Sequence, residues 1–335
     1  MYQPGPLNLI TDVAGLRVGN AEDVAARTGV TVVLPENSMT ASVDVRGGAP
    51  GTRETDALDP TCLVEQADAI VLSGGSAFGL DSASGVMTWL RGRGRGFAVG
   101  GARVPIVPCA ILFDLLNGGE KDWGSTSPYR ELALQACDNA AGEFPLGNIG
   151  AGLGASAADL KGGLGSASSV SADGLQVGAL VAANPYGSTV MPGSDVFWAW
   201  PLENGSEFGG ARPGRLNLAQ DFEFPSEPGV GANTTICVVA TNASLSVAQL
   251  ERLAIMAHDG IARAIRPAHT PFDGDTVFAV STGAGEHCTP ARLAEAGMMA
   301  GDCLARAIAR GVYEAETLGS TQSYRLRHGS KIGAD

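Results

Sequence analysis

A threonine at the junction between a loop and an apolar run carries the most specific chemistry in this sequence. Thr234 follows Asn233 and opens a run to Ala240 that reads as a buried strand. Its hydroxyl could attack the carbonyl carbon of Asn233, break the chain and leave Thr234 as a new N-terminus, where nucleophile and base belong to one residue. The plainer alternative, favoured by composition alone, is a β-branched residue at the start of a strand.

Three other residues could support such a nucleophile. Asp273 and Asp275 stand two residues apart, so in an extended chain both carboxylates would point to one side, where they could hold an ammonium group or orient a hydroxyl. The simpler explanation of this pattern is an Asp-Gly turn that leads into a strand. Asn184, before Pro185, could donate its side-chain amide to an oxyanion, although asparagine is also an ordinary turn former.

Several other motifs fail on their spacing. The glycine-rich run 150–154 lacks the spacing of a dinucleotide fingerprint, and Phe78 occupies the place where a nucleophile elbow needs glycine, which favours Ser76 as a helix N-cap. The histidines lack metal-ligand spacing and are expected to be surface or packing residues, and no cysteines form a C-x-x-C pair. We therefore expect no cofactor and no metal. These residues are His258, His269, His287 and His328, and Cys62, Cys109, Cys137, Cys237, Cys288 and Cys303.

Composition limits the class of protein. With 335 residues, 44% hydrophobic and 17% charged, the chain can bury a sizeable core. The net charge of −13 disfavours nucleic acid and anionic membranes as partners. No run reaches the roughly 18 apolar residues of a membrane span, and the first twelve residues lack the basic start of a signal peptide. Scattered cysteines then favour a cytoplasmic protein with free, mostly buried thiols.

Apolar periodicity predicts interleaved strands and helices, hence an α/β or α+β fold. Strands are expected over 28–34, 68–73, 175–183, 234–241 and 276–281, and helices over 76–90 and 127–141. Ser246 and Gln249 form a capping box before a third helix, and Thr289 with Pro290 begins a last one. Residues 202–232 read as a long surface loop, a feature that is often functional.

Long ordered segments of the chain resemble the L-aminopeptidase/D-esterase family, which includes β-peptidyl aminopeptidases and, more distantly, the endo-type nylon-oligomer hydrolase. The resemblance spans almost the whole chain. It rests on residues 9–19 (LITDVAGLRVG), 43–56 (VDVRGGAPGTRETD), 72–80 (LSGGSAFGL), 233–236 (NTTI) and 269–275 (HTPFDGD).

This resemblance implies a four-layer αββα sandwich of the N-terminal-nucleophile type, built as one domain over 1–335. It implies a precursor that cleaves itself between Asn233 and Thr234, giving an α chain 1–233 and a β chain 234–335. Thr234 matches the nucleophile, Asp273 and Asp275 match the pair that supports it, and Asn184 matches the side-chain donor of the oxyanion hole.

The resemblance also implies a substrate class and an assembly: short peptides, amino-acid amides or esters, cleaved by a homo-oligomer, a tetramer of processed heterodimers. Phe113, where some relatives have a tyrosine, and Gly75 are the substrate-binding candidates. Relatives often carry Gly-Lys where this chain has Ala158-Asp159, and Lys161 matches a separate Lys-Gly-Gly segment.

Two other classes of function stay open. One is an acyltransferase of the ornithine-acetyltransferase type, which would pass the acyl group to an amine instead of water. The other is an unprocessed, non-catalytic binding protein. The sequence does not separate α-peptide, β-peptide, D-ester and synthetic-amide substrates.

Overall fold

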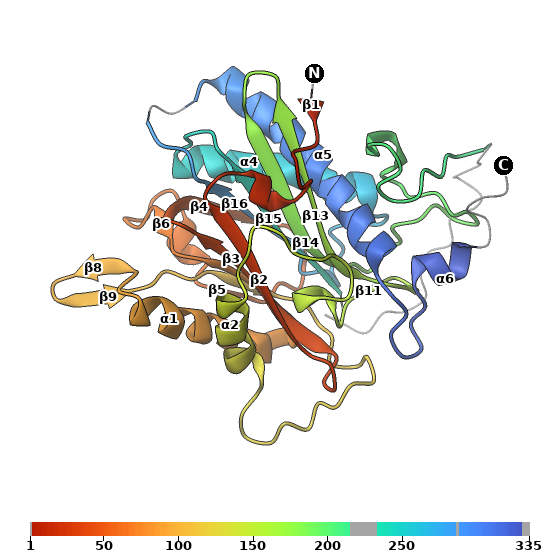
Figure 1. Ribbon diagram of the computed structural model, residues 1–335, viewed down its shortest axis with the longest axis horizontal. Coiled ribbons are helices and arrows are strands. Elements are labelled where there is room, and N and C mark those ends of the chain that lie inside the picture. Colours follow the sequence, from red (N-terminus) through yellow and green to blue (C-terminus); the bar gives the residue numbers. More distant parts are fainter. Residues whose placement is uncertain (1, 215–232, 286–287, 330–335) are drawn as a thin grey trace.

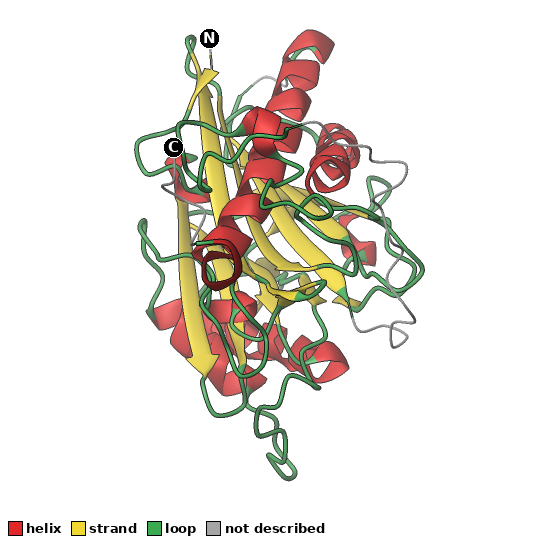
Figure 2. Cartoon of the chain, turned by 90° about the vertical axis from the view of Figure 1, so that its right-hand side faces the viewer, coloured by secondary structure: helices red, strands yellow, loops and turns green. Residues whose placement is uncertain are grey.

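The computed structural model describes residues 2–214, 233–285 and 288–329. Two β-sheets lie face to face in the middle of the molecule, and helices cover the outer face of each (Figures 1 and 2). The four-layer αββα sandwich expected from the family resemblance is therefore confirmed.

The larger sheet, called sheet A, has seven strands among the described residues. All neighbours in it are antiparallel except β15 and β16, which run parallel. In spatial order its strands are β1 (Tyr2–Gln3), β13 (Gly163–Ser171), β14 (Gln176–Asn184), β15 (Thr234–Thr241), β16 (Thr276–Ser281), β4 (Met39–Val45) and β6 (Gln66–Ala67).

The smaller sheet, called sheet B, has five strands in the same part of the chain. Only β7 and β10 pair in parallel. Its order is β2 (Leu16–Asp23), β3 (Thr28–Pro35), β7 (Ile70–Ser73), β10 (Cys109–Ile111) and β5 (Thr52–Arg53). Two short hairpins lie outside both sheets: β8 (Phe97–Val99) with β9 (Ala102–Val104), and β11 (Ser156–Ala157) with β12 (Leu160–Lys161).

Two pairs of helices form the outer layers. Helices α4 (Val247–Ala264) and α5 (Pro290–Glu314) pack on sheet A, and α1 (Ser82–Gly92) and α2 (Tyr129–Asp138) pack on sheet B. A short helix α6 (Tyr324–His328) follows α5. Helix α4 connects β15 to β16, and this crossover is the reason that these two strands can run parallel.

Three buried apolar clusters correspond to the three interfaces of the sandwich, and β15 contributes to two of them. Cys237 and Val239 pack against α4 and α5, whereas Ile236 and Val238 face the space between the sheets. Side chains alternate between the two faces of a strand, so Thr234 faces the space between the sheets.

Most elements predicted from the sequence are confirmed. The predicted strands correspond to β3, β7, β14, β15 and β16, and the helix over 127–141 is the shorter α2. In the capping box, Ser246 Oγ accepts from Gln249 N at 3.3 Å and Gln249 Oε1 accepts from Ser246 N at 3.1 Å. Four of the six free cysteines are buried. The loop predicted over 202–232 lies outside the described residues from 215 onward.

The structure corrects three predictions about helices. The helix over 76–90 begins as a 3₁₀ helix (Ser76–Asp81) and becomes α-helical only at Ser82. Ser76 is not an N-cap: it has φ +51° and is the first residue of the 3₁₀ helix, whose N-cap is Gly75. The helix that Thr289 caps is not the last, because α6 follows it. None of the described helices has the length and apolarity that crossing a membrane requires.

Candidate active site

Thr234 and Asn184 lie directly opposite each other at one end of sheet A. Thr234 is the first residue of β15, Asn184 is the last of β14, and the antiparallel register pairs them. Side chains paired in this way have Cβ atoms about 4.5–5.5 Å apart. Both residues share a face with the inward Leu180 and Ile236, and both are almost completely buried. The predicted nucleophile and oxyanion donor therefore open onto the same space between the sheets.

Two hydrogen-bond donors contact the carbonyl oxygen of the peptide bond before Thr234. The Thr234 hydroxyl donates to the carbonyl oxygen of Asn233, its own preceding residue. The backbone N–H of Gly274 donates to the same oxygen at 3.2 Å. Gly274 approaches so closely that a Cβ there would lie 2.9 Å from Thr234 Oγ. Two donors thus converge on the carbonyl that self-cleavage would attack.

The two aspartates are buried and fully engaged, but with different parts of the site. Asp275 Oδ1 accepts from the backbone N–H of Thr235 at 2.9 Å, which fixes the beginning of β15. Asp273 Oδ1 accepts from Tyr186 N at 3.0 Å, and its Oδ2 accepts from Thr270 Oγ at 2.5 Å. Within the described residues, neither carboxylate bonds to the Thr234 hydroxyl. These hydrogen bonds position the chain around Thr234. The spacing of the two residues predicts a different role, in which the carboxylates hold an ammonium group or orient a hydroxyl directly.

The charge of Asp275 also affects the protonation of Asp273. Burial raises the pKa of Asp273, and the negative charge of Asp275 raises it further, while hydrogen bonds from Thr270 and Tyr186 oppose the shift. An additional cation beside this pair would therefore be favourable. A free ammonium group at residue 234 would be such a cation.

His269 belongs to the site, although the sequence indicated a surface or packing residue. Its ring Nδ1 lies 2.8 Å from Asp275 Oδ2, and its backbone N–H donates to the same oxygen at 3.0 Å. His258 is buried, so it is a packing residue and not a surface one, and its ring packs edge-on against the ring of His269 with centroids 4.9 Å apart. Burial lowers the pKa of His258 to about 4, so that ring is neutral at neutral pH. The sequence did contain a signal for this role, because the segment 269–275 that resembles the family begins with His269 and ends with Asp275.

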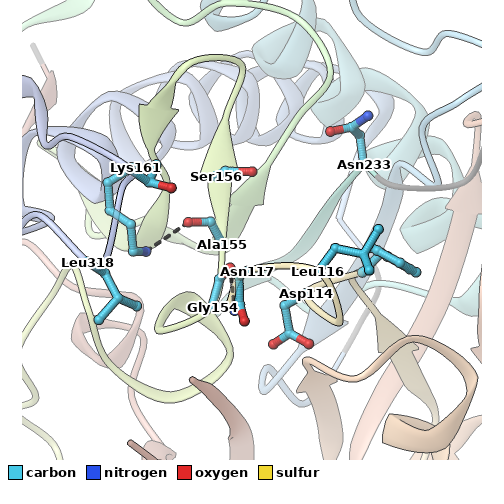
Figure 3. Close-up of a pocket in the computed structure, with 11 residues that line it drawn as sticks. Asp114, Leu116, Asn117, Gly154, Ala155, Ser156, Lys161, Asn233 and Leu318 are labelled. Carbon is cyan, nitrogen blue, oxygen red and sulfur yellow. Dashed lines mark hydrogen bonds between the residues drawn. The ribbon is translucent and has the colours of Figure 1, made fainter. Parts of the chain in front are cut away.

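A cavity of about 230 Å³ adjoins Asn233 (Figure 3). Asn184 connects two of its walls: Oδ1 accepts from Ser156 N at 2.8 Å, and Nδ2 donates to the carbonyl of Phe113 at 3.2 Å. Phe113, a predicted substrate-binding residue, does line the cavity. The described lining residues are Phe113, Asp114, Leu116, Asn117, Gly154, Ala155, Ser156, Lys161, Asn233, Leu318 and Thr321.

Gly75, the other predicted substrate-binding residue, contacts a lining residue but does not line the cavity itself. It is not among the described residues that line this cavity. Its N–H donates to Asp114 Oδ1 at 2.8 Å, and a Cβ on it would lie 2.0 Å from Cζ of Tyr129. With φ +86°, the position suits glycine for conformational and packing reasons.

Lys161 is a buried cation at the cavity wall. Its Nζ donates to the carbonyls of Gly152, Ala155 and Gly162 at 3.0, 2.8 and 2.8 Å, and Figure 3 shows the bond to Ala155. Burial lowers its pKa to about 7, and the Asp114 carboxylate opposes that shift. Three acceptors match the three N–H bonds of an ammonium group, which favours the charged form. Lys161 therefore holds the glycine-rich loop in place.

No group of three or more His, Cys, Asp or Glu side chains with metal-binding geometry occurs in the described part of the chain. The site instead consists of a hydroxyl, a side-chain amide, backbone N–H groups and buried carboxylates. This set suits nucleophilic attack on a carbonyl with stabilisation of the resulting oxyanion.

Comparisons with known proteins agree with this geometry. The sequence profile of peptidase family S58 matches residues 8–325. The chain is 44% identical over 341 residues to an uncharacterised aminopeptidase of Mycobacterium tuberculosis, covering 95% of this chain and 97% of the relative. It is 32% identical over 282 residues to the 6-aminohexanoate-oligomer endohydrolase of Paenarthrobacter ureafaciens, covering 81% and 74%.

Solved structures share the fold. A β-aminopeptidase of Burkholderia sp. superposes with a TM-score of 0.76 at 22% identity, covering 100% of this chain and 97% of that one. The L-aminopeptidase D-Ala-esterase/amidase of Ochrobactrum anthropi, described as a new variant among the Ntn hydrolase fold, superposes with a TM-score of 0.73 at 22% identity, covering 99% and 96%. At this identity the likeness establishes the Ntn-hydrolase type of fold alone.

The packing around Thr234 predicts the effect of adding one methyl group. In Gly274→Ala the new Cβ would lie 2.9 Å from both Thr234 Oγ and the Ala49 carbonyl oxygen. Overpacking of this kind typically costs about 1–3 kcal/mol. Urea denaturation should therefore give a lower free energy of unfolding for Gly274→Ala. Gly142→Ala, where no atom lies within 4 Å of the added Cβ, is the control. Equal stability of the two variants would contradict the close approach.

Proposed function

We propose that this chain, which belongs to peptidase family S58 and is a peptide-bond hydrolase, works through a threonine that it exposes by cutting itself between Asn233 and Thr234. The observation that carries the proposal is the convergence of the Thr234 hydroxyl and the Gly274 N–H on the carbonyl oxygen of Asn233. An ordinary strand start would need neither contact.

Self-cleavage would follow from this arrangement. Thr234 Oγ attacks the carbonyl carbon of Asn233, and the oxyanion that forms accepts from the N–H of Gly274. The C–N bond then breaks, the hydroxyl proton passes to the nitrogen of Thr234, and an ester joins the two residues. Water hydrolyses that ester, which leaves a carboxylate on Asn233 and a free amine on Thr234.

The mature site would repeat the same chemistry on a substrate. The free amine of Thr234, with a reference pKa of about 7.7–8.0, takes the proton from Oγ as the oxygen attacks the substrate carbonyl. Asn184 Nδ2 donates to the oxyanion, and the proton passes to the leaving amine. Water then releases the acyl group from Thr234 Oγ. Loss of a donor such as Asn184 typically costs about 2.7–4 kcal/mol of barrier.

Asp275 and His269 would act by positioning. Asp275 receives the N–H of Thr235 through Oδ1 and two N–H groups of His269 through Oδ2, so both oxygens are held. A carboxylate fixed in this way locks the beginning of β15, and with it the direction of the Thr234 hydroxyl. Asp275 contacts Thr235, the residue next to the new ammonium group of Thr234, so its negative charge stabilises that group.

Short peptides, amino-acid amides or esters are the substrates that this cavity supports best. Its volume of about 230 Å³ lies below the roughly 300–1,000 Å³ of sites for drug-sized ligands, so it has room for one small acyl group. Relatives named as aminopeptidases and as a 6-aminohexanoate-oligomer endohydrolase act within this chemical range.

Replacing the hydroxyl tests the proposal. Thr234→Ala should give a single band of full length on a denaturing gel and no turnover of aminoacyl-p-nitroanilides, because the nucleophile is lost. Wild type should give two bands and turnover. Thr235→Val is a matched control, because the neighbouring hydroxyl is buried and has no partner among the described residues. Cleavage or activity in Thr234→Ala would refute the assignment.

The positioning role of His269 predicts a graded loss. His269→Ala removes one hydrogen bond to the Asp275 carboxylate, and a bond to a charged group is worth about 1.5–3 kcal/mol, so kcat should fall about 10- to 100-fold. His269→Gln keeps a donor and should recover part of the loss. Steady-state kinetics on the processed enzyme measure both. Equal kcat in wild type and His269→Ala would show that the bond has no role in the reaction.

The proposed base predicts a shift of the pH profile. The amine of Thr234 must be neutral to accept a proton, so kcat/KM should rise with pH through the pKa of that amine. The carboxylate of Asp275 stabilises the ammonium form and raises this pKa. In the processed fraction of Asp275→Asn the rising limb should therefore move to lower pH. An unmoved limb, or one moved to higher pH, would exclude the amine as the group that titrates.

A further inference from the structure

We propose that a cavity lined by four arginines, on the face of sheet B opposite Thr234, binds a small polyanion that carries two or more phosphate or carboxylate groups. This arginine cavity, defined by Arg53, Arg91, Arg103 and Arg130, encloses about 720 Å³. It has no part in the peptide hydrolysis proposed above.

The arginine cavity lies between elements that are distant in the sequence. Arg53 comes from β5, Arg91 from α1, Arg103 from the β8–β9 hairpin and Arg130 from the first turn of α2. In Figure 1 this hairpin extends beyond the body of the molecule, beside α1. Because α1 covers the outer face of sheet B and Thr234 faces the inner space, sheet B separates the cavity from the candidate active site.

Positive charge is uncompensated in this cavity. None of the four arginines forms an ion pair with a carboxylate of the described residues, and no Asp or Glu is among the described residues that line it. The whole chain has 35 acidic and only 22 basic residues. A hollow lined by four guanidinium groups without a paired carboxylate among the described residues is therefore unusual for a chain of this composition. Their mutual repulsion would be relieved by an anion.

Neutral acceptors hold three of the guanidinium groups in place. Arg53 Nη1 donates to Ser84 Oγ at 2.7 Å, and its Nη2 donates to Met87 Sδ at 3.3 Å. Arg130 Nη2 donates to Thr88 Oγ at 3.2 Å, and Arg103 Nη1 donates to the carbonyl of Gly96 at 3.2 Å. These contacts orient the groups without neutralising them. A guanidinium has five N–H donors, so several remain for a ligand.

The ligand class follows from the donors and the volume. Guanidinium groups bind phosphate and carboxylate through paired N–H bonds, which a single halide cannot accept in the same way. The four groups come from four different elements around a hollow of this size, so a ligand with at least two anionic groups can engage more of them than a single anionic group can. A volume of about 720 Å³ fits a small molecule, since such sites span roughly 300–1,000 Å³.

Titration calorimetry of the full chain with inorganic pyrophosphate and, separately, with citrate tests the proposal. The proteins are wild type, the double variant Arg103→Gln/Arg130→Gln, and Arg17→Gln as the control. All three replaced arginines are exposed, and Arg17 lies on β2, away from the cavity. We expect saturable binding of at least one probe to wild type, about tenfold weaker binding to the double variant, and no change in Arg17→Gln.

The two probes separate the possible sources of the anion: preference for pyrophosphate indicates a phosphorylated ligand, and preference for citrate indicates a polycarboxylate. Absence of saturable binding of either probe would overturn the proposal, as would equal weakening by Arg17→Gln. Sedimentation of the same proteins without ligand completes the test. A change of mass in the double variant alone, with no probe bound, would assign the cavity to contact between chains and would equally overturn the proposal.

Discussion

The register between β14 and β15 is the constraint on which the site depends. It places Asn184 opposite Thr234 at one end of sheet A, with both side chains in the space between the two sheets. Because side chains alternate along a strand, a slip of one residue would turn Thr234 toward α4 and α5 and bring Thr235 to the site. The apolar residues of β15 prevent that slip, since Ile236 and Val238 are buried between the sheets and Cys237 and Val239 beneath the helices. Packing along the whole strand thus fixes the direction of one hydroxyl at its end.

Buried charged side chains lie around Asn184 and Thr234, and most of their hydrogen bonds are to backbone groups. Lys161 donates to three carbonyls, and Asp273 and Asp275 accept backbone N–H groups of Tyr186, Thr270, Thr235 and His269. Buried ions held in this way resist reorganisation, and they fix loops that have no regular secondary structure. The glycine-rich loop and the 269–275 turn are both held by such ions. A site of this kind keeps its donors aimed while a charge develops, which is the condition for electrostatic stabilisation of an oxyanion.

Much of this arrangement was predictable from the sequence, and the remainder depends on contacts between distant segments. A continuous apolar run predicted β15, and the spacing of Ser246 and Gln249 predicted the beginning of α4. Asn184 could be named as a candidate, but its pairing with Thr234 depends on a register between strands some 50 residues apart. His269 was interpreted as a surface or packing residue, because its bond to Asp275 forms only once the 269–275 turn is folded, with φ +54° at His269. Gly274 was interpreted as a turn residue, yet its close approach to Thr234 Oγ exists only once β15 and the 269–275 turn are packed together.

The central claim is that this geometry makes the bond before Thr234 break. The most direct measurement is the intact mass of the purified wild-type chain, together with the N-terminal sequence of every fragment present. Self-cleavage predicts two masses, those of residues 1–233 and 234–335, and an internal N-terminus that reads Thr-Thr-Ile-Cys. A single mass for all 335 residues, in a preparation that hydrolyses aminoacyl-p-nitroanilides, would contradict the account.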